Sequence, residues 1–408
     1  MALLNFKLYM INKEIKNMKK ILLQLCLLLV ISSNSSAKEN SMIWYVGHMD
    51  GSGNKVPMLT SSHLNSLGNV TEFIISPTYS EKNISYASYR FNQGAYYSYG
   101  QYILDIENTL VTINNNNPNT KVWISTPPII QKNCQVCLID KLHYYPSKTS
   151  DVNAFLVDLK LAIENKLGTS FWENNVSGIY LYDEGLKAAH VNSKMTNYVK
   201  ALARYVDTTY NQKKLMWAPY YNLENGSSQA RIISSWLSTN AFDRIDIQPN
   251  VIFRSNIIHN SKATTCNSAI KLDEQFCEPD KTALSTIKSW VASQSVNGVR
   301  NPRVEIGVVM ELENTFDSRV YSSLPKFDPG KTLEKTQRYY ANYVKTFQQF
   351  VGNKNFTFYA GTASWLNFTP ALSNCINDFY DGVNENGLSI TWSDNQVFEA
   401  PACTRHYY

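Results

Sequence analysis

Two glutamates stand at the ends of short apolar runs, a placement suited to acid–base chemistry. Glu184 ends the run 178–184, and Glu311 directly follows the run 304–310. Cleavage of a glycosidic bond needs one carboxylic acid to protonate the leaving oxygen and one carboxylate to attack or to activate water. We assign Glu184 as general acid/base and Glu311 as nucleophile. We expect retention, which requires a carboxyl separation of about 5 to 5.5 Å, whereas roughly 6.5 to 9.5 Å would give inversion.

Further polar and aromatic residues near the ends of such runs are candidates for binding a sugar. Glu313 shares a face with Glu311 by the two-residue alternation of a strand, whereas Glu305 of that face lies at the opposite end and is expected to be structural. Aromatic faces suit sugar rings, and ordinary packing is the alternative for each of them. The candidate substrate-binding residues are Asp183, Glu313, His48, Asp50, Tyr182, Trp217, Tyr220, Tyr221, Gln248, Asn250, Tyr359 and Trp365.

The elements that must position these residues follow one repeating pattern. Short runs rich in β-branched and aromatic residues cover 42–47, 70–76, 121–126, 178–182, 214–219, 244–248, 304–310 and 355–360. Segments that suit helices lie between them, at 60–67, 96–113, 152–167, 193–210, 227–237, 282–293 and 332–350. This alternation predicts an α/β fold, a (β/α)8 TIM barrel, whose reacting residues project from the carboxyl ends of the strands.

The first 37 residues are predicted to be an N-terminal extension and a secretory signal peptide. Lys19 and Lys20 precede the apolar run 21–31, and Ala37 ends a small-residue cleavage site. That run is too short to span a bilayer, and no later stretch is apolar enough to act as an anchor. We therefore expect a secreted or periplasmic protein without a stable membrane anchor.

The remainder is predicted to form the barrel, over 40–385, and an irregular tail, over 386–408. Cys26 lies in the predicted signal, and the even number of other cysteines suits disulfides in an oxidising compartment. Pairing by proximity, one of several possible connectivities, would join Cys134 to Cys137, Cys266 to Cys277 and Cys375 to Cys403. The first two pairs would staple loops on the catalytic face, and the third would tie the tail.

Composition excludes some partners. The net charge is +5 and the lysines and arginines are scattered, so no basic stripe for binding nucleic acid is present. Aromatic residues make up 12% of the chain, a content that suits the binding of sugars. We expect a monomer that acts on a carbohydrate without a cofactor or a metal.

The residues around Glu184 and Glu311 resemble barrel glycosidases that carry an acid/base Glu after strand four and a nucleophile Glu after strand seven. Asp183 stands where that family has an Asn whose amide binds a sugar hydroxyl. Over about 178–313 the chain is also similar to uncharacterised bacterial glycosidase-like barrels, domains of unknown function. This similarity rests on the segments Tyr-Leu-Tyr-Asp-Glu, Trp-Ala-Pro-Tyr-Tyr, Ile-Gln-Pro-Asn and Met-Glu-Leu-Glu. The resemblance implies a glycoside hydrolase.

Chitinase-like barrels offer a second comparison, because their strand four reads Asp-Gly-x-Asp-x-Asp-x-Glu. Glu184 aligns with the final Glu of that pattern. Ser177, Tyr180 and Tyr182 occupy the places of the aspartates. The acid that would orient an N-acetyl group in substrate-assisted cleavage is thus missing, and the chemistry of two glutamates is preferred.

Two other functions compete with the hydrolase. The first is a carbohydrate-binding barrel in which the aromatic residues bind but the acids do not react. The second is a metal-dependent polysaccharide deacetylase that uses His48, Asp50 and a further ligand. The chain has only 6 His and no H-x-H or H-x-x-x-H pair, so the deacetylase is the weaker of the two.

Overall fold

The chain forms two compact units, Met1–Lys38 and Glu39–Tyr408, of which the second contains the barrel. A computed structural model describes only part of the chain. The described residues are Lys19, 38–46, 59–77, 99–126, 149–182, 184–186, 194–210, 212–221, 226–249, 278–312, 340, 343–360, 370–382, 388–391, 397–400 and 403.

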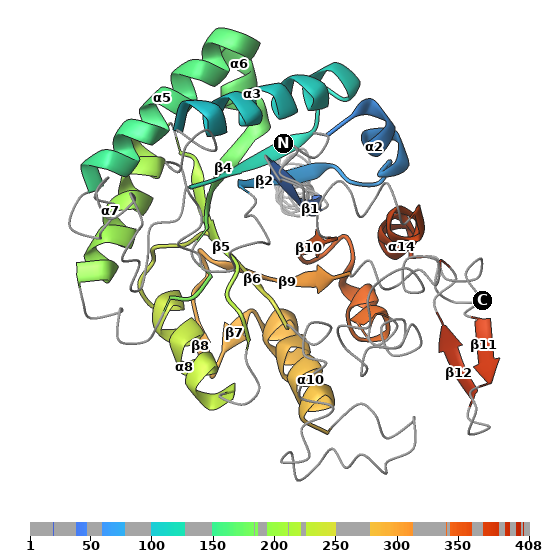
Figure 1. The fold of residues 1–408 in the computed structure, drawn as a ribbon. Coiled ribbons are helices and arrows are strands. Elements are labelled where there is room, and N and C mark those ends of the chain that lie inside the picture. Colours follow the sequence, from blue (N-terminus) through green and yellow to red (C-terminus); the bar gives the residue numbers. More distant parts are fainter. Residues whose placement is uncertain are drawn as a thin grey trace, which may run out of the picture. The chain divides into compact units, whose positions relative to one another are not determined.

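Eight parallel strands close into a barrel in the order β1-β10-β9-β6-β5-β4-β3-β2 (Figure 1). They are β1 (Asn40–Val46), β2 (Glu72–Pro77), β3 (Lys121–Ser125), β4 (Val176–Leu181), β5 (Lys214–Trp217), β6 (Arg244–Ile247), β9 (Glu305–Glu311) and β10 (Phe356–Tyr359). Each strand overlaps one of the predicted runs. The predicted (β/α)8 barrel is confirmed.

Helices surround the barrel (Figure 1). They are α2 (Ser61–Ser66), α3 (Tyr99–Asn116), α5 (Thr149–Leu167), α6 (Thr169–Asn175), α7 (Lys194–Thr209), α8 (Gly226–Leu237), α10 (Glu278–Ser293), α14 (Pro370–Asp381) and the 3₁₀ turn η7 (Gln348–Phe350). The sequence prediction lacks α6 and α14. Helix α6 follows α5 after the single residue Gly168, whose φ is 89°. The hydrophobic period of this short helix is therefore not separated from that of α5 in the sequence. Tyr340 and residues 343–347 are also helical.

The tail after the barrel differs from the predicted irregular segment. Strands β11 (Leu388–Thr391) and β12 (Val397–Ala400) form an antiparallel hairpin. Its register pairs Leu388 with Ala400 and Ile390 with Phe398. The sequence Leu-Ser-Ile-Thr of β11 alternates apolar and polar residues, which is a local signal for a strand.

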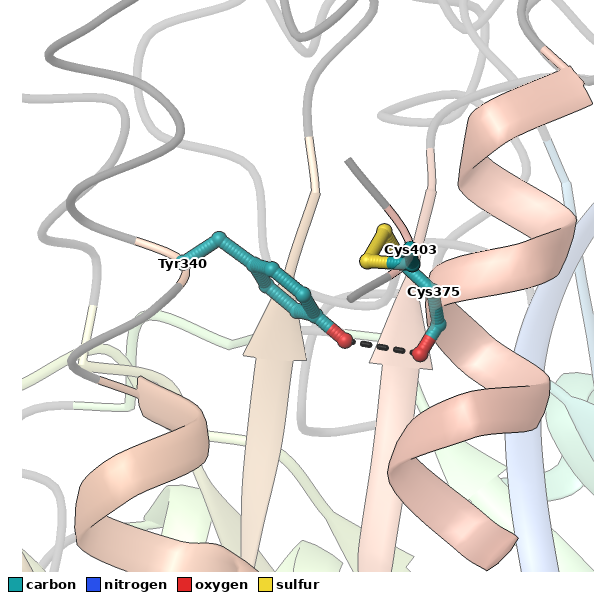
Figure 2. Close-up of a disulfide and its surroundings, with 3 residues drawn as sticks. All are labelled: Tyr340, Cys375 and Cys403. Carbon is teal, nitrogen blue, oxygen red and sulfur yellow. Dashed lines mark hydrogen bonds between the residues drawn. A yellow bond between two sulfur atoms is a disulfide. The ribbon is translucent and has the colours of Figure 1, made fainter. Parts of the chain in front are cut away.

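A disulfide joins Cys375 of α14 to Cys403, beyond β12 (Figure 2). This is the pair that proximity in the sequence predicts. The hydroxyl of Tyr340 donates a hydrogen bond of 2.8 Å to the Cys375 carbonyl oxygen. Tyr380 of α14 donates to the carbonyl oxygen of Ser41 in β1 and to that of Phe356 in β10, at 2.8 and 3.0 Å. Helix α14 is therefore hydrogen-bonded to both β1 and β10 where these first and last strands of the barrel pair.

The barrel interior is filled by side chains that alternate with those facing the helices. The inner apolar cluster is made of Ile43, Ile74, Trp123, Tyr180, Met216, Ala218 and Val309. Residues at the intervening positions belong to the larger cluster between the strands and the helices, as Met310 of β9 does. Because strand side chains alternate with a period of two, the parity of a position decides which of these two cores it joins.

A buried ionic network crosses the interior beside this cluster. Arg244 of β6 forms ion pairs with Glu72 of β2, at 2.6 Å, and with Asp246 of β6, at 2.7 Å. Thr357 donates to Asp246, and the Trp123 indole N–H donates to Glu72, each at 2.6 Å. Burial disfavours the charge of Arg244, but Asp246 and Glu72 outweigh it and raise the pKa of the guanidinium. These charges hold β2, β6 and β10 together from the inside.

Candidate active site

Glu184 lies three residues beyond the end of β4, at the carboxyl-terminal mouth of the barrel, and is partly exposed. The Tyr180 hydroxyl donates a hydrogen bond of 3.1 Å to Oε1 of Glu184. Tyr220 and Gln248 also hydrogen-bond to this carboxyl group. We call Tyr180, Tyr220 and Gln248 the Glu184 donor set. All three are neutral, so the carboxyl group is solvated by dipoles and has no counter-ion among them.

Two members of the donor set, Tyr220 and Gln248, lie just beyond β5 and β6, where the pairing of these strands continues. Tyr220 and Gln248 form an isolated parallel bridge. The backbone N–H of Gln248 donates to the Pro219 carbonyl oxygen at 2.9 Å, and its side-chain amide donates to the Ala218 carbonyl oxygen at 2.7 Å. A side chain tied to a neighbouring strand cannot change rotamer freely. Gln248 is therefore a fixed partner of Glu184.

The environment of Glu184 favours the protonated form of its carboxyl group. Burial raises the pKa of its carboxyl group above the ordinary value, and the hydrogen bonds from Tyr220, Gln248 and Tyr180 only partly oppose this. The proton is therefore retained to a higher pH than on a solvated glutamate. A catalytic acid requires this property, since it must hold a proton at the pH where it works.

Glu311 is the last residue of β9 and lies beside Tyr359 in the register of β9 and β10. It has the parity of Val309, an inner-cluster residue, so its backbone directs it toward the barrel interior. Its side chain is only 1% exposed. The Tyr343 hydroxyl donates a hydrogen bond of 2.6 Å to Oε2 of Glu311. Glu311 is therefore more enclosed than Glu184 and is also bound by a neutral phenol.

Tyr45 and Tyr359 contact each other, and each lies near one of the two glutamates. Their rings lie edge to face, with centroids 5.7 Å apart, and both residues are partly exposed. Burial raises the pKa of Tyr45 most, followed by the nearby Tyr359 and Glu184. Tyr45 thus lies near Glu184 and packs on Tyr359, which neighbours Glu311. Phenols therefore lie near both glutamates.

Sequence reasoning missed Tyr45 and Tyr343. Tyr45 could have been found, because it shares the parity of Ile43 and lies near the carboxyl end of the first strand. Tyr343 could not, because no local pattern shows that a residue of a covering helix reaches the end of β9.

Two predicted sugar-stacking residues pack against other aromatic side chains of the fold. Trp217 is fully buried and stacks on Phe242, with ring centroids 5.4 Å apart. Its neighbours Met216 and Ala218 face the interior, so the period of two turns Trp217 toward the helices. Tyr221 is 6% exposed and packs edge to face on Trp290 of α10 at 5.2 Å. These contacts favour the packing alternative for Trp217 and Tyr221, whose contact with substrate stays a prediction.

The structure brings other predicted site residues together. Tyr220, Gln248 and Tyr359 lie at the mouth, close to one or other glutamate. Tyr182 is buried, its backbone N–H donates to Thr126 at 3.2 Å, and its phenol lies close enough to Tyr45 to influence it. The remaining predicted residues lie outside the described part of the chain and stay predictions: His48, Asp50, Asp183, Asn250, Glu313, Trp365, Cys134, Cys137, Cys266 and Cys277.

Neither a metal cluster nor a membrane span is found among the described residues. No group of three or more His, Cys, Asp or Glu side chains in that part of the chain is arranged to hold a metal ion. None of the helices described combines the length and apolar character that crossing a membrane requires.

No protein-family model matches the chain, and no curated protein matches it. Among solved structures it is similar to a GH18 chitinase from Flavobacterium johnsoniae, with 15% identity, a TM-score of 0.43, and coverage of 86% of this chain and 96% of the other. For a GH5 glycoside hydrolase from Prevotella bryantii the values are 11%, 0.45, 84% and 96%. For a chitinase-like agglutinin from Robinia pseudoacacia they are 13%, 0.45, 84% and 100%. At such low similarity, only the chain's own side chains can carry a functional conclusion.

Proposed function

We propose that this protein is a secreted glycoside hydrolase that cleaves a polysaccharide or glycoconjugate with Glu184 as general acid/base and Glu311 as nucleophile. The observation that carries the proposal is the position of Glu184, a partly exposed carboxyl group at the mouth of a (β/α)8 barrel that accepts a hydrogen bond from Tyr180. The raised pKa of this group agrees with the role of an acid. Barrel enzymes place their reacting groups at this end of the strands.

The chemistry follows from the different environments of the two acids. Glu184 donates its proton to the glycosidic oxygen, and the bond between that oxygen and the anomeric carbon breaks. Glu311 attacks the anomeric carbon and forms a glycosyl-enzyme ester. Glu184, now a carboxylate, takes a proton from water, whose oxygen displaces Glu311 and releases the sugar with retained configuration. The donor set stabilises the carboxylate form of Glu184 that exists between the two steps.

The phenols at the mouth also suit a carbohydrate. Tyr45, Tyr220 and Tyr359 are partly exposed, and each side chain combines an aromatic ring with a hydroxyl group. Such side chains can pack on a pyranose ring while they hydrogen-bond to its hydroxyls. This supports a sugar substrate more than a purely apolar one.

The test is hydrolysis of a glycan panel by the wild type, Glu184→Gln and Glu311→Gln. Each substitution is expected to lower kcat by about 10²- to 10⁴-fold or more. Glu305→Gln is the matched control, because Glu305 lies on the same strand and parity as Glu311 at the other end, where it accepts a hydrogen bond from Asn355. It should retain near-wild-type turnover. Full activity of Glu184→Gln would remove the acid from its role, and NMR of the first-formed product anomer tests retention.

One observation favours a second function, a carbohydrate-binding barrel without catalysis. The 1% exposure of Glu311 gives a substrate little access to its carboxylate. Such a barrel would bind members of the glycan panel without cleaving them, and Glu184→Gln would leave that affinity nearly unchanged. Measured binding without turnover by the wild type would decide for it.

A further inference from the structure

Glu311 and Tyr343 form a buried pair at the end of β9. Their side chains are 1% and 0% exposed, and a hydrogen bond of 2.6 Å joins the phenol to Oε2 of the carboxylate. We propose that Tyr343 is a positioning residue, which fixes the orientation of the Glu311 carboxylate toward the anomeric carbon. The inference rests on the proposed function, since it assumes that Glu311 is the nucleophile.

The hydrogen bond joins two different parts of the fold. The parity of Glu311 directs it toward the interior, whereas Tyr343 belongs to the apolar core between strands and helices. The Tyr343 ring is buried in that core and packs near the ring of Phe347, with centroids 6.3 Å apart. A phenol held in this way fixes one oxygen of the carboxylate without itself supplying a positive charge.

Tyr340 provides an internal contrast. It lies three residues earlier, is 1% exposed, and also donates through its hydroxyl, but to the carbonyl oxygen of Cys375 at 2.8 Å (Figure 2). Both tyrosines are buried, and both donate a hydrogen bond through the phenol. Tyr343 donates to a candidate catalytic group, whereas Tyr340 donates to the backbone. Tyr340→Phe is therefore a matched control for Tyr343→Phe.

The experiment compares the wild type, Tyr343→Phe and Tyr340→Phe in steady-state kinetics and in covalent trapping. Loss of the Tyr343 hydroxyl is expected to lower kcat by about 10- to 100-fold with KM nearly unchanged, because only the alignment of the attacking oxygen is lost. The rate at which a 2-deoxy-2-fluoro glycosyl fluoride labels Glu311, measured by mass spectrometry of peptides, should fall in parallel. Tyr340→Phe should leave both rates within about two-fold of the wild type, although it loses similar stability.

The outcomes separate this inference from the proposed function. Wild-type kcat and trapping rate in Tyr343→Phe overturn the positioning role, while inactive Glu184→Gln and Glu311→Gln keep the hydrolase. Equal losses in Tyr343→Phe and Tyr340→Phe also overturn it, since they indicate a general effect of packing. Absence of label on Glu311 in an active wild type overturns both the nucleophile and the inference. If Tyr343→Phe does not fold, Tyr343→Met repeats the removal of the donor, and melting curves establish folding in every case.

Discussion

The acidic residues of the barrel lie in two contrasting environments. In the network at Arg244, the carboxylates of Glu72 and Asp246 are buried and bound by a cation. At the mouth, Glu184 is partly exposed and bound by the neutral groups of its donor set, and burial raises its pKa. The first arrangement pairs its acids with a cation, whereas the second favours a retained proton on Glu184.

This contrast shows that the partners of a carboxylate depend on its position along the barrel axis. In the interior, Glu72 and Asp246 join strands through the guanidinium of Arg244. At the mouth, phenols and an amide solvate the Glu184 carboxylate less strongly than a cation would, and burial raises the pKa of the group. A raised pKa is what the proposed role of Glu184 as a proton donor requires.

The largest expected effect comes from breaking the network. Arg244→Met leaves Glu72 and Asp246 buried without their cation, and should lower the free energy of unfolding by about 3–5 kcal/mol. Urea unfolding followed by circular dichroism measures this. The control is Lys160→Met, which removes a surface pair with Glu164 at 3.4 Å and should cost less than about 0.5 kcal/mol. Similar losses in both variants would refute the distinction.

A smaller loss of stability should follow when an added side-chain atom crowds the Arg244 network without removing the cation. A Cβ at Gly307 of β9 would collide with the Asp246 carboxylate and lie 2.6 Å from the Asn355 carbonyl oxygen. Gly307→Ala should therefore cost about 1–3 kcal/mol, because strand and carboxylate must shift. Unfolding in urea again gives the value. Gly185→Ala is the control, since no atom of the described residues, its chain neighbours apart, lies within 4 Å of a Cβ there. A stable Gly307→Ala protein would contradict the close approach.

The smallest expected effect on stability concerns Glu184 at the mouth. Because the folded-state pKa of Glu184 is raised, the folded chain holds a proton that the unfolded chain has released above the ordinary value of 4.5. The contribution of this group to stability therefore falls as pH rises from 4.5 through the raised pKa. Glu184→Gln, which is always neutral, should melt above the wild type at pH near 7, and the difference should vanish at pH below about 4. A lower melting temperature of Glu184→Gln at neutral pH would show that the carboxylate is stabilising instead.

Local pattern was sufficient for most of the fold and for part of the site. The runs that became β4 and β9 are recognisable by their residue types, and their ends placed Glu184 and Glu311 at the mouth. Residues at and just past the end of β5 were harder to assign. Trp217 and Tyr221 have the same composition signal as Tyr220, but only Tyr220 of these three reaches Glu184. Composition does not show which face of a strand a side chain joins.

The sequence by itself determined the eight strands, their closure into a barrel and the strand ends that carry the two glutamates, because these follow from periodicities of a few residues. Only the tertiary structure decided the partners of those glutamates. The Glu184 donor set comes from three strands, and the phenol that binds Glu311 comes from a helical segment beyond β9. Contacts between residues far apart in the chain depend on how strands and helices pack, which no local period encodes. The pKa of Glu184 and the orientation of Glu311 are therefore properties of the folded barrel.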